Sequence, residues 1–133
     1  MSADALSSIR RVFEAFRGGD PRALFEVIAE DAVWVVNGTV PVAQRYEGRS
    51  RIFELFRETR RLTDGTYLSE LRWALADGDH AVAVYRASGT RGDRVIDIDQ
   101  ALLITLRDDR WQEVVAVPTD PEAFAAFWGD NTP

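Results

Sequence analysis

The stretch VIDIDQALLITLRDDRWQEVVAV, residues 95–117, decides the fold class. Residues 95–107 and 111–117 are rich in valine, isoleucine and leucine, and the dipeptide Asp108-Asp109 lies between them. Apolar, β-branched runs separated by a short polar turn are typical of antiparallel strands. The stretch therefore predicts a long strand, a tight turn and a second strand that runs back beside the first.

Two more strands are predicted immediately before this pair. Residues 67–76 lead into Asp77-Gly78-Asp79, and residues 81–90 lead into Arg91-Gly92-Asp93. Asp-Gly and Gly-Asp pairs between apolar runs are signals of β-hairpins. The second half of the chain is therefore expected to form a meander of four antiparallel strands.

The first part of the chain has the pattern of helices. Apolar residues recur at three- and four-residue spacing over residues 2–16, with Ser2 as the expected N-cap and Gly18-Gly19 as the stop. A second, short helix is expected to begin at Asp20-Pro21, with Asp20 as its N-cap and Pro21 in its first position. The residues expected on its buried face are Leu24, Phe25 and Ile28.

Residues 32–36 (AVWVV) are too apolar and β-branched for a surface helix and predict a strand. An irregular loop is expected over residues 39–48, followed by a helix over residues 49–61. Asp120-Pro121 begins a closing helix, with Asp120 as its N-cap. Helices on one side of an antiparallel sheet define an α+β domain, and the space between the layers is a common place for a ligand pocket.

The composition narrows the possible chemistry. The chain has 133 residues, 46% of them hydrophobic, which suits one domain over residues 1–133. It has no cysteine, a single histidine and no lysine, because all 16 basic residues are arginine. This excludes disulfides, thiolate nucleophiles, cysteine-based zinc sites and Schiff-base lysines. The net charge of −6 argues against nucleic-acid binding. No membrane-spanning or signal segment is visible, so a cytoplasmic protein is expected.

Several strings, in order along nearly the whole chain, resemble the SnoaL-like branch of the nuclear-transport-factor-2-like superfamily. They are Gly19-Asp20, residues 30–34 (EDAVW), residues 46–49 (YEGR), residues 75–79 (LADGD), residues 106–111 (LRDDRW), and Asp120 with Phe127-Trp128. The resemblance implies a cone-shaped, curved antiparallel sheet wrapped around N-terminal helices, a cystatin-like roll. It also implies an apolar pocket for a hydrophobic small molecule, and a homodimer.

Relatives in this superfamily include polyketide cyclases, ketosteroid isomerases and limonene epoxide hydrolases. The resemblance therefore implies isomerisation, cyclisation or epoxide opening by acid–base chemistry, with no metal and no organic cofactor. Ketosteroid isomerases use a base and two oxyanion-binding groups, and the matching positions here are Val36, Val12 and Leu102. SnoaL-like sequences often carry histidines at positions that match Val35 and Leu102. Because these side chains cannot transfer protons, a non-catalytic ligand-binding or dimerisation module remains the alternative.

Asp97, Asp99 and Gln100 are the polar candidates on the long strand. The two aspartates could line the cavity as a carboxylate pair, one of them acting as the catalytic base. Alternation along a strand instead places both opposite Ile96 and Ile98, on the outer face of the sheet, and this interpretation is favoured. Gln100 shares its parity with the apolar inner set, so it is expected to meet a ligand or a buried partner.

Four aromatic residues are candidates for substrate binding: Trp34, Tyr46, Trp73 and Tyr85. Trp34, Trp73 and Tyr85 would wall a pocket for a flat or apolar ligand, and the Tyr85 hydroxyl would orient a carbonyl group. Plain core packing is the alternative for these three, because large aromatic residues in strands are more often core. Tyr46 lies in the loop that borders the pocket opening in related folds, where it would touch the ligand.

The remaining candidates have structural interpretations. His80 lies at a hairpin tip and is expected to be exposed, and it has no second histidine with which to hold a metal. Arg49 is expected to form a structural ion pair with a carboxylate. Ala101, Leu103 and Val115 give the outer sheet face an apolar character, which favours pairing with a second copy of the chain.

Overall fold

The structure is a computed structural model that describes residues 2–129, with the side chains of residues 5–129. The expected cap at Ser2 therefore lies outside the described side chains. The described elements follow in order along the chain. They are α1 (Ser2–Phe16), α2 (Arg22–Val27), β1 (Ile28–Val36), β2 (Arg45–Glu47), α3 (Arg49–Leu62), β3 (Leu68–Asp77), β4 (His80–Arg91), β5 (Arg94–Arg107), β6 (Arg110–Pro118) and α4 (Pro121–Trp128).

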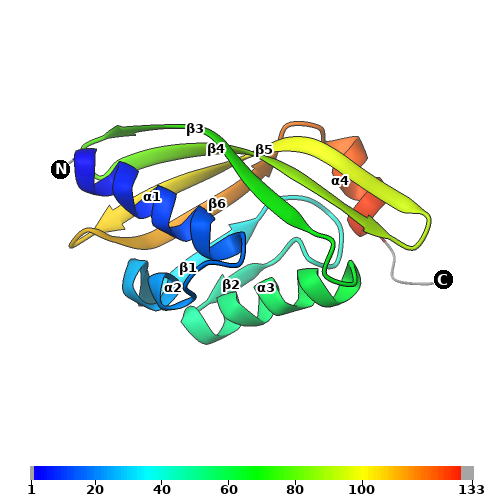
Figure 1. The fold of residues 1–133 in the computed structure, drawn as a ribbon, viewed down its shortest axis with the longest axis horizontal. Coiled ribbons are helices and arrows are strands. Elements are labelled where there is room, and N and C mark those ends of the chain that lie inside the picture. Colours follow the sequence, from blue (N-terminus) through cyan, green and yellow to red (C-terminus); the bar gives the residue numbers. More distant parts are fainter. Residues whose placement is uncertain (1, 130–133) are drawn as a thin grey trace.

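A six-stranded curved sheet lies over the helices, in the order β2-β1-β6-β5-β4-β3 (Figure 1). The four strands of the predicted meander pair antiparallel with their neighbours. The α+β prediction is confirmed. Two details of the sheet differ from it, because β1 joins β6 in parallel and because the expected loop over residues 39–48 contains the edge strand β2.

The turn between β5 and β6 explains why the opening stretch folds as a hairpin. Asp108 and Asp109 both have positive φ, 54° and 64°, as a two-residue type I′ turn requires. The register then pairs Leu102 with Ala116 and Ile104 with Val114, so the apolar side chains of both strands lie on the same face. Gln112 is an extra residue between the Leu106–Trp111 and Thr105–Glu113 pairs, so the tight turn and this bulge together fix which residues of the hairpin enter the core.

Strand alternation on β5 is as the sequence predicts. Ile96, Gln100, Leu102 and Ile104 are buried on the inner face, whereas Asp97 and Leu103 are exposed on the outer face. The inner face packs on α1, whose Ile9, Val12 and Phe13 are buried against it. Burial of these side chains positions the sheet over the helices.

The start of α2 and the start of β1 differ from the prediction. The N-cap of α2 is Pro21, and Asp20 accepts a hydrogen bond of 3.0 Å from the backbone N–H of Arg22. Ile28 begins β1, where it is fully buried. Phe25, expected on the buried face, is half exposed because it projects beside Arg49 and Phe53.

A bulge in β3 overturns the expected position of Trp73. Leu71 pairs with Tyr85, but Trp73 pairs with Val84, so Arg72 is an additional residue in the ladder. Without that residue, Trp73 would share the inner face with Leu71. Trp73 is instead 51% exposed on the outer face, and its expected role as a pocket wall is wrong.

Helix α4 closes one end of the sheet and is held there by two arginines. Asp120 caps it as predicted, accepting a hydrogen bond of 3.0 Å from the N–H of Ala123. At its other end, Arg91 donates to the carbonyl oxygen of Phe127 (2.9 Å) and Arg94 donates to that of Gly129 (2.8 Å). The cations complement the carbonyl end of the helix. Over residues 2–129, no helix is long and apolar enough to cross a membrane.

Candidate ligand pocket

A cavity of about 220 Å³ lies between the inner face of the sheet and the helices. Side chains from all four helices and from five strands or their ends line it. The apolar part consists of Ala15, Phe16, Pro21, Leu24, Trp34, Val36, Val42, Leu55, Phe56, Leu102, Ala116, Pro118, Phe124 and Trp128. Such a lining suits a hydrophobic molecule, because apolar ligand surface would leave water there.

One end of the cavity is polar, and it centres on a pair of residues that face each other on β4 and β5. The side-chain Nε2 of Gln100 donates a hydrogen bond of 2.6 Å to the hydroxyl oxygen of Tyr85. Ser69 and Tyr67 line the same cavity. Gln100 is only 4% exposed, and its Oε1 has no hydrogen-bond partner among the described residues. This end therefore contains an acceptor that a ligand could use.

The two tyrosines are held in the protonated form. Burial raises the pKa of Tyr67 to about 12, although hydrogen bonding to Ser69, Gln100 and Tyr85 opposes the shift. Burial also raises the pKa of Tyr85 well above its ordinary value. Tyr85 accepts from Gln100 through its oxygen and is also hydrogen-bonded to Tyr67, so its O–H can donate either to Tyr67 or to a ligand. At neutral pH the polar end thus offers phenol donors and an amide acceptor.

The mouth of the cavity is marked by its exposed lining residues. Pro21 and Arg60 are exposed, whereas Tyr85 and Gln100 are buried. The opening therefore lies on the side of the start of α2 and the last turn of α3, and the buried Gln100 and Tyr85 form the floor.

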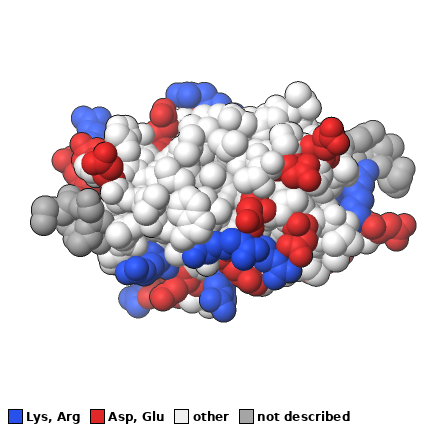
Figure 2. Space-filling view, turned by 90° about the horizontal axis from the view of Figure 1, so that it is seen from above, with Lys and Arg blue, Asp and Glu red and all other residues white. Residues whose placement is uncertain are grey.

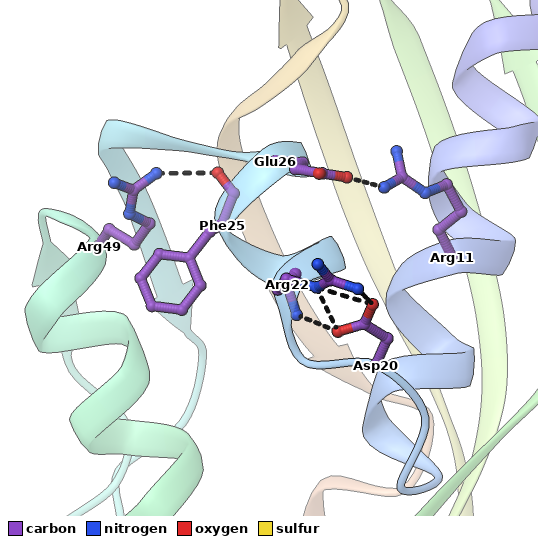
Figure 3. Close-up of polar contacts among 6 residues, drawn as sticks. All are labelled: Arg11, Asp20, Arg22, Phe25, Glu26 and Arg49. Carbon is purple, nitrogen blue, oxygen red and sulfur yellow. Dashed lines mark hydrogen bonds and ion pairs between the residues drawn. The ribbon is translucent and has the colours of Figure 1, made fainter.

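Helix α2, which forms one side of this mouth, is tethered to both neighbouring helices (Figure 3). Arg11 of α1 forms an ion pair with Glu26. Arg49 donates a hydrogen bond of 2.9 Å to the carbonyl oxygen of Phe25 and one of 3.2 Å to that of Ile28. The expected tie of Arg49 to a carboxylate is therefore wrong, because its guanidinium reaches backbone carbonyls at the end of α2.

The structure brings three of the predicted site residues together in the cavity, namely Trp34, Tyr85 and Gln100. Tyr46 is buried elsewhere, and its hydroxyl donates a hydrogen bond of 2.9 Å to the carbonyl oxygen of Val42. It does not line the cavity. The Tyr46 ring instead lies under the guanidinium of Arg51, whose central carbon is 5.8 Å from the ring centroid.

Asp97 and Asp99 lie on the opposite face of the sheet from the cavity. Arg86 donates two hydrogen bonds to Asp97 (2.7 and 2.8 Å), and Arg72 donates one of 2.6 Å to Asp99. The Arg86 guanidinium lowers the pKa of Asp97. The interpretation of these aspartates as a carboxylate pair inside the cavity is therefore wrong, because strand alternation turns both outward.

Sequence reasoning missed four polar lining residues: Thr59, Arg60, Tyr67 and Ser69. Tyr67 and Ser69 are two residues apart, so their side chains lie on the same face of the sheet, and this alternation could have predicted that both line the cavity.

Of the positions where related isomerases carry polar groups, Val36 and Leu102 line the cavity and Val12 is buried in the core. Among the described residues, no group of three or more His, Asp or Glu side chains could hold a metal ion.

The curved sheet, the helices beneath it and the apolar cavity define the class of protein. The SnoaL-like domain model matches residues 9–114, and the chain belongs to this family. An uncharacterized protein of Mycobacterium tuberculosis is 32% identical over 130 residues, covering 96% of this chain and 99% of the relative.

Solved structures with the same fold extend the comparison. Bal32a, from a soil-derived mobile gene cassette, matches with a TM-score of 0.91 and 26% identity, covering 96% of this chain and 98% of that one. TerC, co-crystallised with polyporic acid, matches with a TM-score of 0.78 and 18% identity, covering 93% of this chain and 97% of that one. At this identity, the likeness to TerC concerns the fold alone.

Proposed function

We propose that this protein binds a hydrophobic small molecule in the cavity and acts on a carbonyl group of that molecule by isomerase- or cyclase-type chemistry. The observation that carries the proposal is the buried Gln100–Tyr85 hydrogen bond at the end of an otherwise apolar cavity. A carbonyl oxygen placed there would accept a hydrogen bond from Tyr85. A neighbouring hydroxyl of the ligand would donate to Gln100 Oε1.

The proposed chemistry is stabilisation of negative charge that develops on the carbonyl oxygen. Tyr85 and Tyr67 remain protonated because burial raises the pKa of both hydroxyls. Donors fixed in a site of low polarity stabilise an enolate or alkoxide more than they stabilise the neutral carbonyl. Tyr85 is then the proposed catalytic residue, and Gln100 is a positioning residue that directs the Tyr85 proton toward the ligand.

The absence of acidic side chains from the described lining limits the reaction class. Epoxide opening by water needs a base that activates the water, and proton removal from a weakly acidic carbon needs one too. Reactions limited by oxyanion stabilisation, on carbonyl compounds whose α-protons are acidic enough for water or buffer to accept them, fit the cavity better. The co-crystallisation of TerC with polyporic acid supports a small-molecule ligand in this fold.

A non-catalytic ligand-binding protein is the second candidate, and the lack of a lining carboxylate is what favours it. Hydrogen–deuterium exchange at the α-carbons of 2-tetralone distinguishes the two candidates, because exchange reports enolate formation whatever the natural substrate is. The enzyme proposal expects faster exchange with the natural chain, and a rate about tenfold lower or less with Tyr85→Phe. Tyr46→Phe is the control, because Tyr46 lies outside the cavity.

Binding of 2-tetralone without any acceleration of exchange would overturn the enzyme proposal and support the binding protein. Equal acceleration by the natural chain and Tyr85→Phe would also overturn it, since the donor would then be unnecessary.

We also propose that the outer sheet face pairs with a second copy of the chain. Exposed and partly exposed apolar side chains form a cross-strand row in which Leu75 pairs with Val82, Val82 with Leu103, and Leu103 with Val115. Leu75 and Leu103 are 66% and 45% exposed. Figure 2, viewed from the side of β3 and β4, shows uncharged side chains across the middle of this face, with charged residues around them. A continuous apolar face of this kind favours a partner surface over water.

A further inference from the structure

Among the described residues that line the cavity, Arg60 is the one with a charged side chain. It lies in the last turn of α3, at the mouth, and is exposed. Two other arginines of α3 have carboxylate partners on the same helix, because Arg61 pairs with Glu58 and Arg51 with Glu54. Among the described residues, no carboxylate lies within ion-pair distance of Arg60. Its guanidinium is therefore available to a ligand.

The charge at the mouth is opposite to that of the whole protein. The chain has 22 acidic and 16 basic residues, yet none of the described lining residues is acidic. An anion that approaches the cavity meets a positive charge at the mouth and no negative side chain within it. The charge pattern therefore selects for an anionic ligand over a neutral or cationic one of the same shape.

Resting on the proposed function, we infer that the ligand is a hydrophobic carboxylate whose charged group binds Arg60 at the mouth. The planar guanidinium can donate two parallel hydrogen bonds to a carboxylate. The floor cannot take that group, because Gln100 and Tyr85 are buried without a cation among the described lining residues around them. The orientation is thus fixed, with the carboxylate outside and the reacting polar group inside.

The inner end of the ligand carries a hydrogen-bond donor. Gln100 Oε1 is buried without a partner, and such an acceptor loses its hydration without recovering a hydrogen bond. A ligand hydroxyl at this position restores the bond. The class of ligand is therefore a flat or apolar body with a hydroxyl or enol at one end and a carboxylate at the other.

Isothermal titration calorimetry with three probes tests this assignment. The probes are 6-hydroxy-2-naphthoate, its neutral methyl ester, and 2-naphthoate, which lacks the hydroxyl. We expect the natural chain to bind the hydroxy acid about three- to tenfold more tightly than the ester, as suits a partly exposed ion pair. Arg60→Gln should remove this preference while it leaves the affinity for the ester unchanged.

Arg57→Gln is the matched control, because Arg57 is exposed on the same helix and does not line the cavity. It should retain the preference for the acid. The 2-naphthoate probe should bind more weakly than the hydroxy acid, and Gln100→Leu should abolish that difference.

Equal affinities for acid and ester, or equal effects of the two arginine substitutions, would overturn the carboxylate assignment and leave the pocket proposal standing. Failure of all three probes to bind, in a chain that also fails to bind 2-tetralone, would overturn both.

Discussion

The side-chain nitrogen of Gln100 donates a hydrogen bond of 2.6 Å to the hydroxyl of Tyr85, and the two residues are direct cross-strand partners on β5 and β4. The bond is buried, and it leaves Gln100 Oε1 without a hydrogen-bond partner among the described residues. An acceptor without a partner is costly to bury in an apolar environment. Its position in the cavity lining explains that cost, because a ligand can supply the missing donor.

The first prediction is that Tyr85 and Gln100 contribute to ligand affinity and not to the free energy of unfolding. The double variant Tyr85→Phe/Gln100→Leu removes both polar groups of this bond together, and the Tyr67 hydroxyl keeps Ser69 as its hydrogen-bond partner. We expect a free energy of unfolding within about 1 kcal/mol of the natural chain, or higher. Urea titration measures it, and calorimetry with 2-tetralone should show that binding is lost. A large loss of stability would mean that the pair serves the core.

The second prediction follows from the raised pKa of Tyr67. In the unfolded chain this hydroxyl ionises near pH 10, whereas in the folded chain its pKa is about 12. The folded state therefore keeps the Tyr67 proton to a higher pH than the unfolded state does. The contribution of Tyr67 to the free energy of unfolding is fully present below pH 10 and is lost as the pH rises to 12. Tyr67 contributes at most about 2–3 kcal/mol to this loss.

Urea unfolding of the natural chain and of Tyr67→Phe between pH 9 and pH 12 checks this expectation. The variant should lose less stability than the natural chain over that range. Parallel curves would show that Tyr67 is not protected from ionisation by burial.

The third prediction separates the outer-face aspartates from the cavity. Asp97 forms its hydrogen bonds with Arg86 on the far face of the sheet, so Asp97→Asn should change the rate of 2-tetralone exchange by less than about twofold. Because the group is exposed, its stability effect is expected to be small. A large loss of exchange activity with an unchanged fold would restore Asp97 as a catalytic candidate.

The fourth prediction tests the proposed pairing of two copies. Leu103→Arg places a charge in the middle of the apolar row, and this should convert a dimer into a monomer. Light scattering coupled to size-exclusion chromatography at micromolar concentration measures the mass. Val95→Arg is the control, because Val95 is exposed at the end of β5, outside the row. A monomeric natural chain, or dissociation of both variants alike, would contradict the proposal.

The sequence predicted the fold well because strand alternation and turn chemistry are local signals. The Asp108-Asp109 turn and the inner position of Gln100 follow from spacing alone. Trp73 was placed wrongly because one bulge residue, Arg72, inverts the parity of β3. No local signal at Arg72 distinguishes a bulge from a regular strand.

The candidate site was predicted only in part because it depends on the register between strands. Tyr85 and Gln100 were identified one by one, but their contact follows from the β4–β5 pairing, which the sequence does not state. Arg60 was missed for a similar reason. Its place in the lining depends on how α3 packs against β1, and an arginine in the last turn of a helix is otherwise explained by the helix dipole.

The central claim is that Tyr85, directed by Gln100, donates a hydrogen bond to the carbonyl of a ligand in the cavity. The ¹³C chemical shift of the carbonyl carbon of bound, labelled 2-tetralone tests this most directly, because hydrogen bonding to the oxygen moves the resonance downfield. We predict a downfield shift in the natural chain that is reduced in both Tyr85→Phe and Gln100→Leu. The same carbonyl shift in all three proteins, with the ligand bound in each, would contradict the claim.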